Sequence, residues 1–275
     1  MANPDKSGRS WDLVWLSILV FALLIVRACI QSVTIDEADA FTAFATRDSG
    51  LMWYPVAQNH LLNTMLERLA WKIFGFNQIA MRLPALLGGV IYLAASISIC
   101  SRFAGRLFRV MIFVCLAANP FVLDYLVAAR GYSLAVAFLL AAIAVFWGSV
   151  DRVLSGEPVC RWRCALVSVL LALSFAANFS FAIVDIVAAV IFLIGVFVAG
   201  DLPLKRTARL APLAIWGTLP GIVAGMFLCI SVLARWHAGE FVFGAHSLRE
   251  MWTSLFGTLF PPPNPEIVNP VLYHA

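Results

Sequence analysis

The sequence predicts an all-α fold, a polytopic bundle of about seven transmembrane helices with interfacial helices in a long first outer loop. The chain is 62% hydrophobic and only 12% charged, with a mean hydropathy of +0.92. A soluble domain carries about 25% charged residues. The apolar residues also gather into segments that approach the roughly 20 residues needed to cross a bilayer. We therefore expect residues 1–275 to form a single transmembrane domain, with 235–275 as an outer tail.

The expected spans follow from the apolar segments and their interruptions. They are 11–31, 84–101, 110–124, 132–150, 164–178, 181–199 and 211–234, of which 110–124 and 164–178 are short. The first follows Lys6 and Arg9 and lacks a clear cleavage site, so it is expected to stay as an anchor. The continuous apolar stretch 164–199 is too long for one crossing, and Asn178 and Ser180 divide it into a hairpin.

Basic residues predict the orientation, because Lys and Arg accumulate in cytoplasmic loops. Every second loop of the expected topology is basic. The residues concerned are Lys6, Arg9, Arg102, Arg106, Arg109, Arg152, Arg161, Arg163, Lys205, Arg206 and Arg209. This pattern predicts an N-terminus in the cytoplasm, and the expected location is the plasma (inner) membrane. Most carboxylates and all four histidines then fall on the outer, periplasmic face.

The first outer loop, 34–83, is far longer than an ordinary connection and is not of low complexity. Apolar residues recur at helical spacing over 60–74, which predicts an amphipathic helix in the membrane interface, ended by Gly75. Its other face, with Asn63, Glu67, Arg68 and Lys72, is expected to meet water. A helix that only packs on the bundle is the alternative. A second short helix is expected to start within 36–46.

Two arginines on the expected outer side are candidate phosphate ligands. Pro84 suits the first turn of a new helix, which leaves Arg82 just outside it at the membrane surface. Snorkelling to lipid phosphates is the alternative role for Arg82. The next outer loop holds Asp124, Arg130 and Tyr132, and the guanidinium of Arg130 can bind phosphate with two parallel hydrogen bonds. An ion pair of Arg130 with Asp36 or Glu37 is the structural alternative for that residue.

These segments resemble the GT-C class of integral membrane glycosyltransferases. The resemblance lies in "TIDEADAF" after the first span, in "NHLLNTMLERLAWKIFGFNQIAMRLPALLGG" and in "NPFVLDYLVAARGYSLA", which together cover 34–140 in the family's order. Within this class, the segments most resemble those of protein mannosyltransferase-like and aminoarabinose transferase-like enzymes. His60 is followed by Leu61 and Leu62, where relatives often have prolines. Family members commonly have more spans and often a soluble C-terminal domain, so a short version, a fragment or a truncated product is left open.

The resemblance implies sugar transfer from a polyprenyl-phosphate donor to a lipid, glycan or protein acceptor at the outer face. Asp36 matches the family's catalytic Asp, and Glu37 stands beside it, to position the acceptor or a neighbouring Arg. An acceptor hydroxyl needs a base, whereas a phosphate leaving group needs only a nearby cation. The expected substrate-binding residues are Arg130, Arg82, His60, Tyr132 and Asp124. The sequence specifies neither the sugar nor the acceptor.

No metal or other cofactor is predicted. Asp36, Glu37 and Asp39 are hard oxygen ligands that could hold a divalent ion, but acids so close in sequence need not converge. Cys160 and Cys164 lack the further ligands of a zinc site. Nucleic-acid binding is not expected, because the net charge of +4 is modest and no basic stripe is present.

Two other functions remain open. The first is a non-catalytic membrane protein of the same fold, such as an assembly partner. In such a protein Asp36, Glu37 and Asp39 would only stabilise the start of a helix, where negative charge is favoured by about 0.3–1 kcal/mol. A transporter would place polar residues within the spans, and the few candidates are Asn178, Asp185 and the pair Asn119–Pro120.

Overall fold

The computed structural model describes residues 11–46, 53, 59–155, 157, 160–198 and 207–235, and then 247, 249–250, 252–253 and 256. The chain divides into two compact units, Met1–Arg235 and Trp236–Ala275. In the described part of the second unit, the rings of Trp252 and Phe256 lie 5.9 Å apart. His237, His246 and His274, expected on the outer tail, lie outside the described residues.

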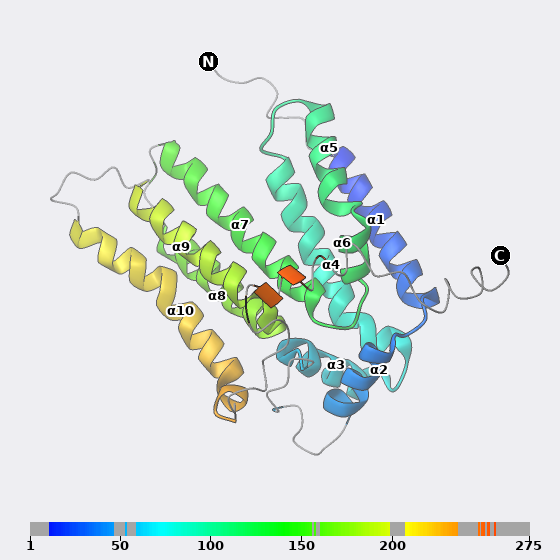
Figure 1. Cartoon of the computed structure of the whole chain (residues 1–275). Coiled ribbons are helices and arrows are strands. Elements are labelled where there is room, and N and C mark those ends of the chain that lie inside the picture. The colour runs from blue at the N-terminus through cyan, green and yellow to red at the C-terminus, as the bar shows by residue number, and fades with distance from the viewer. Residues whose placement is uncertain are drawn as a thin grey trace, which may run out of the picture. The chain divides into compact units, whose positions relative to one another are not determined.

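Every regular element of the described residues is a helix (Figure 1). In chain order these are α1 (Trp11–Ile30), α2 (Ile35–Ala40), the π-helix η2 (Phe41–Thr46), α3 (Leu61–Phe74), α4 (Gln78–Cys100), α5 (Arg106–Ala117), α6 (Pro120–Tyr125), α7 (Tyr132–Leu154), α8 (Arg161–Ala177), the short 3₁₀ helix η4 (Phe179–Phe181), α9 (Ala182–Val198) and α10 (Thr207–Leu233). The all-α prediction is confirmed for this part of the chain.

Among the described residues, four helices are long and apolar enough to cross a membrane. They are α1, α4, the Tyr132–Arg152 part of α7 and the Ala214–Leu233 part of α10. The helices α5, α8 and α9 have 12, 17 and 17 residues and fall below that length. The prediction of a membrane protein therefore agrees with four candidate spans, and the larger count of seven stays a prediction.

Several expected boundaries agree with the structure. The hairpin break is present, because α8 ends at Ala177 and the Asn178 side chain accepts from the backbone N–H of Ser180 at 3.0 Å. Gly75 follows the last residue of α3 as its C-cap. The short helix expected within 36–46 is also present, since α2 begins one residue earlier, at Ile35, and continues into η2.

Two expected span boundaries are wrong. The fourth helix begins at Gln78 rather than at residue 84, because the Asn77 side chain caps it by accepting from Ala80 N–H at 2.8 Å. Pro84 therefore lies inside α4. A helix in a membrane bundle tolerates such a proline, because neighbouring groups satisfy the backbone atoms that it leaves without partners. The expected span 110–124 is interrupted, since α5 ends at Ala117 and Pro120 starts α6. Proline lacks a backbone N–H and disfavours a helical conformation in the residue before it.

The helices pack closely where small side chains meet. A Cβ on Gly88 of α4 would lie 2.4 Å from the Ser133 Oγ of α7, so these helices approach too closely for any larger residue. Ser133 Oγ donates to the Ala85 carbonyl at 2.6 Å across the same contact. Small residues with short polar side chains are the usual means of close helix contact in membranes.

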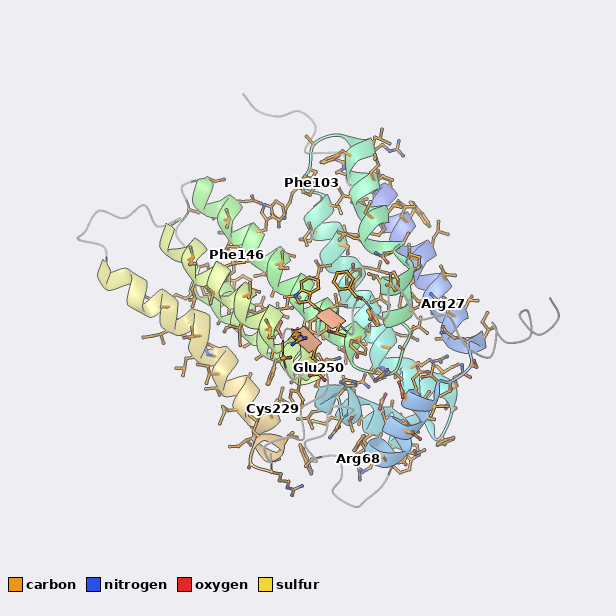
Figure 2. The ribbon with its side chains drawn as sticks, viewed as in Figure 1. Arg27, Arg68, Phe103, Phe146, Cys229 and Glu250 are labelled. Atoms are coloured by element: carbon orange, nitrogen blue, oxygen red, sulfur yellow. The ribbon has the colours of Figure 1, made fainter. Side chains whose placement is uncertain are left out.

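The first unit has two chemically different ends. At one end, called here the arginine end, Arg102 forms an ion pair with Asp151 and Arg106 forms one with Asp12 at 3.3 Å. At the other, called the α3 end, lie α2, η2 and α3 (Figure 1). Figure 2 shows Phe103 at the arginine end and Arg68 at the α3 end. The expected separation of arginine loops from the mixed polar loops is thus present in the described residues.

Candidate functional site

The α3 end begins with a capping box at the start of α2. The Thr34 Oγ1 accepts from the Glu37 backbone N–H at 3.3 Å, and the Glu37 Oε2 accepts from the Thr34 N–H at 2.8 Å. This exchange satisfies two N–H groups that a helix start leaves without partners. It also orients the carboxylates of Asp36 and Glu37 differently, since neighbouring residues of a helix point about 100° apart.

Glu37 is buried and fully occupied by structural partners. Its side chain is only 2% exposed and receives hydrogen bonds from Arg82 Nε at 3.3 Å and Arg82 Nη2 at 3.1 Å. The backbone N–H of Ala129 donates to its Oε1 at 2.8 Å. Desolvation alone would raise the pKa of Glu37, but the hydrogen bonds from Arg82, Thr34 and Ala129 and the charge of Arg82 outweigh it and lower that pKa. Glu37 is therefore an ionised anchor.

Arg82 lies inside α4 with 1% of its side chain exposed, so the expectation that it sits just outside the helix at the membrane surface is wrong. Besides binding Glu37, it donates to the carbonyls of Ala28 at 3.1 Å, Gln31 at 2.7 Å and Ser32 at 3.0 Å. The carbonyls at a helix end have no partner within the helix and attract cations. Arg82 thereby joins the end of α1 to α2 and α4. Its donors are used within the protein, which argues against the expected contact with a donor phosphate.

Asp36 and Arg130 form the exposed counterpart of this buried pair. Arg130 Nη1 donates to Asp36 Oδ2 at 2.9 Å, and the two side chains are 30% and 57% exposed. The Arg130 guanidinium carbon also lies 5.7 Å from the centre of the Tyr132 ring. The ion pair that the sequence left open for Arg130 is thus the one with Asp36. Both groups remain accessible to a ligand.

The buried His60 and two tyrosines pack together beside Arg130. The His60 and Tyr132 rings lie 5.5 Å apart, and Tyr125 stacks on Tyr132 at 4.8 Å. Gly131 has a φ of +72°, and a Cβ there would lie 2.2 Å from the Ala177 carbonyl oxygen. Only glycine fits both conditions. Burial, and then the charge of Arg130, lower the pKa of His60 to about 4, so its imidazole is neutral near pH 7.

Asn63 and Glu67 of α3 point inward, so the expectation that these two meet water is wrong, whereas Lys72 is exposed as expected and Arg68 is partly buried. Asn63 and Glu67 are both buried, and Asn63 Nδ2 donates to Glu67 Oε1 at 2.8 Å. By contrast, Leu69, Ile73 and Phe74 are exposed. Burial raises the pKa of Glu67 well above its usual value, against the hydrogen bond from Asn63 and with the help of the Glu37 charge. The helix α3 thus buries part of its polar face and exposes part of its apolar face.

Sequence reasoning missed the role of this buried polar layer. Thr64 Oγ1 donates to the buried Asn59 Oδ1 at 3.0 Å, one position along from the Asn63–Glu67 pair. The available signal was the spacing of Asn63 and Glu67, because residues four apart share a helix face. That spacing is equally compatible with a helix face exposed to water and with a buried polar face. Only the packing of α3 distinguishes these two arrangements.

Asp124 has a partner of its own. Arg27, in the last turn of α1, forms an ion pair with it (Figure 2 labels Arg27). The expected substrate-binding residues therefore divide into three groups. Arg130 and Tyr132 are partly exposed and lie with the buried His60, next to Asp36. Arg82 is buried, and Asp124 is paired with Arg27 of α1.

Neither metal ligation nor known relatives add to this picture. The described residues contain no group of three or more His, Cys, Asp or Glu side chains that could hold a metal ion. No protein-family model matches the chain, and no curated protein or solved structure is significantly similar to it.

Proposed function

We propose that the protein is a GT-C-type membrane glycosyltransferase that moves a sugar from a polyprenyl-phosphate donor to an acceptor hydroxyl. The observation that carries this proposal is the exposed Asp36–Arg130 pair, 2.9 Å apart, at one end of an apolar helix bundle. A carboxylate that can take a proton and a guanidinium that can hold a phosphate are the two groups this transfer needs.

In the proposed reaction, the donor phosphate binds Arg130 and takes over its hydrogen bonds from Asp36. The released Asp36 carboxylate accepts the proton of the acceptor hydroxyl as the oxygen attacks the sugar's anomeric carbon. A new carbon–oxygen bond forms there, and the bond to phosphate breaks. The electron pair leaves with the polyprenyl phosphate, whose charge Arg130 stabilises.

The surrounding residues support these two groups. The Glu37–Arg82 pair acts as a positioning device, since it holds the start of α2 against α4 and α1 without facing a substrate. Tyr132 packs against Arg130 and is a candidate face for the sugar. The neutral imidazole of His60 adds a hydrogen-bonding group without adding charge.

The proposal also specifies a membrane topology, which goes beyond the four candidate spans. Seven spans, a cytoplasmic N-terminus and a site on the outer face of the plasma membrane would put the arginine end in the cytoplasm. A lipid-borne donor then reaches Asp36 from the outer leaflet. The position of Arg102 and Arg106 at the arginine end supports this orientation.

The direct test uses the purified full chain in proteoliposomes with polyprenyl-phosphate-linked hexoses and pentoses. The expected result is release of free polyprenyl phosphate that depends on added acceptor lipid, glycan or peptide. If no donor of the panel binds or is consumed, the proposal is wrong and a non-catalytic membrane role replaces it.

Transport is a second candidate because of one feature of α8 and α9. Asn178 and Asp185 are both buried in the mostly apolar helical hairpin of α8 and α9. Ionisable side chains within apolar segments commonly mark transport pathways. Ion or solute uptake by the same proteoliposomes, abolished by Asp185→Asn and not by Asp36→Asn, would favour this candidate over sugar transfer.

A further inference from the structure

Two arginines from different helices meet over one glycine at the arginine end. Arg102 follows α4 in a turn, where its backbone N–H donates to the Ile99 carbonyl at 3.2 Å. Arg163 lies near the start of α8. A Cβ added to Gly148 of α7 would lie 3.0 Å from Arg102 Nη2 and 3.2 Å from Arg163 Nη1. The glycine therefore lets both guanidinium groups approach the same small region.

One of these two charges has no acid partner in the described part of the chain. The acids described at this end each pair with an arginine: Asp12 with Arg106, Asp151 with Arg102, and Glu157 with Arg152. That leaves Arg163, whose buried Nε also has no hydrogen-bond partner among the described residues. Its guanidinium carbon lies 5.4 Å from the centre of the Trp162 ring. Two like charges so close repel each other, so the arrangement favours a bound anion.

The donors of Arg102 are partly free to meet such an anion. Its Nη1 is paired with Asp151, but its Nη2 lies 3.4 Å from the Ala144 carbonyl, which is long for a hydrogen bond. Together Arg102, Asp151 and Arg163 carry one net positive charge. A phosphodiester carries one negative charge and has several acceptor oxygens, and guanidinium groups are well suited to bind it.

The arginines stand where a membrane helix would reach the lipid headgroups. Both α4 and the Tyr132–Arg152 part of α7 are long and apolar enough to cross a membrane, and Arg102 and Gly148 lie at their ends on this side. Trp147 and Trp162 are next in sequence to Gly148 and Arg163, and they are 36% and 59% exposed. Exposed tryptophans are typical of the headgroup level of a bilayer.

An apolar surface continues from the arginines along α7. The rings of Trp147 and Phe103 lie 5.6 Å apart, and Phe103 is the residue after Arg102 (Figure 2 labels Phe103). One turn earlier on α7, Ile143 is exposed as well. Residues four apart share a helix face, so Ile143 and Trp147 extend this surface toward the middle of the helix. A hydrocarbon chain can lie on it while its polar head reaches the guanidinium groups.

We propose that Arg102 and Arg163 bind the phosphate of an anionic phospholipid in the leaflet at the arginine end. The phosphate oxygens accept from Arg163 and from Arg102 Nη2, and an acyl chain lies on Trp147 and Ile143. A water-soluble phosphate compound offers the same polar group, but the exposed apolar surface beside it favours a lipid. The bound lipid joins the end of α4 to the start of α8. This site is separate from Asp36 and Arg130 and does not depend on sugar transfer.

The experiment measures dissociation constants of single lipid molecules bound to the purified full chain in detergent, by native mass spectrometry. Phosphatidylglycerol is compared with phosphatidylcholine, at an ionic strength of about 0.15 M, where charges more than about 8 Å apart are largely screened. Arg163→Gln removes the unpaired charge. Arg161→Gln is the matched control, since Arg161 is exposed on the same turn and points about 200° away.

Two further variants keep both charges at the site, so they test its geometry even where Arg163→Gln does not fold. Arg163→Lys loses the paired donors of the guanidinium. Gly148→Val places a branched side chain between the two groups and separates them.

The expected result is that phosphatidylglycerol binds about tenfold more tightly than phosphatidylcholine, and that Arg163→Gln removes this preference. Arg163→Lys and Gly148→Val should each weaken phosphatidylglycerol binding by about threefold or more, and Arg161→Gln by less than about twofold. Equal losses in Arg161→Gln and Arg163→Gln would show unspecific attraction and overturn the proposal. So would equal binding of the two lipids. Displacement of phosphatidylglycerol by an equal concentration of glycerol phosphate would show a site for a water-soluble phosphate and overturn the lipid assignment.

Discussion

Arg82 donates to both carboxylate oxygens of Glu37, at 3.3 Å and 3.1 Å, with both side chains almost completely buried. One residue away, Asp36 pairs with Arg130 in an exposed position. Two adjacent carboxylates thus have different tasks, because one is committed to the fold and the other can exchange its partner for a ligand.

Asp36→Asn should lower the rate of sugar transfer by about a hundredfold or more, because the amide is nearly isosteric but cannot accept the proton. Turnover is measured on folded, purified protein at saturating donor. Asp39→Asn on the same helix is the control and should transfer at the wild-type rate. Near wild-type turnover by Asp36→Asn would remove the residue from the mechanism.

Arg130→Lys should weaken donor binding by about tenfold or more, since lysine keeps the charge but loses the paired donors of the guanidinium. The apparent affinity for a polyprenyl-phosphate sugar is the measurement. Arg106→Lys, in the ion pair with Asp12 at the arginine end, is the matched control. If Arg130→Lys and Arg130→Ala both bind donor as the wild type does, the phosphate lies elsewhere.

Arg82→Met should destabilise the protein by about 3–5 kcal/mol, because it leaves the Glu37 carboxylate buried without its cation. The double variant with Glu37→Gln should regain part of this loss. Arg106→Met should cost less than about 1 kcal/mol, since that pair is exposed. Reversible unfolding in detergent with increasing SDS measures all of these, and a small effect of Arg82→Met would contradict the anchoring role.

Glu67→Gln should make stability less dependent on pH. In the folded protein the raised pKa keeps Glu67 protonated, whereas the unfolded chain loses that proton above about pH 4.5. Above that pH the unfolded state binds fewer protons than the folded state. The contribution of Glu67 to the free energy of unfolding therefore falls as the pH rises from about 4.5 toward the folded pKa of Glu67, by at most about 1.4 kcal/mol per pH unit. Glutamine still accepts from Asn63 and removes this loss. Unfolding measured from pH 5 to pH 8 should show a flatter profile, and parallel profiles would show that Glu67 is ionised when folded.

Cysteine labelling should reveal the orientation. In a cysteine-free background, Thr42→Cys at the α3 end should react with an impermeant maleimide on intact cells. Ser155→Cys, just after α7, should react only after permeabilisation. Both positions are exposed. External labelling at Ser155 would reverse the topology and place Asp36 in the cytoplasm.

The sequence by itself determined the composition class and most helices. Segments with no charge for nearly 20 residues or more can satisfy their backbone in lipid only as helices, so α7, α10 and most of α4 were predictable. The breaks at Asn178 and after Phe74 were also predictable, because local groups mark them: a capping amide in one case and a glycine in the other. The resemblance to a known family implied the candidate acid Asp36, and residue type and position along the chain suggested the cation Arg130.

Only the tertiary structure decided which polar side chains are buried with partners in the protein and which are exposed to a ligand. An amphipathic pattern such as that of α3 says that two faces differ, but it does not say which face meets the interior when the surroundings are apolar. In this structure Asn63 and Glu67 turn inward to each other, and Leu69 and Ile73 turn outward. Likewise, the burial of Arg82 depends on carbonyls at the end of α1, about fifty residues earlier in the chain, and on Glu37. Partners so distant in sequence leave no periodic signal, so packing alone separates the anchoring pair Glu37–Arg82 from the exposed pair Asp36–Arg130.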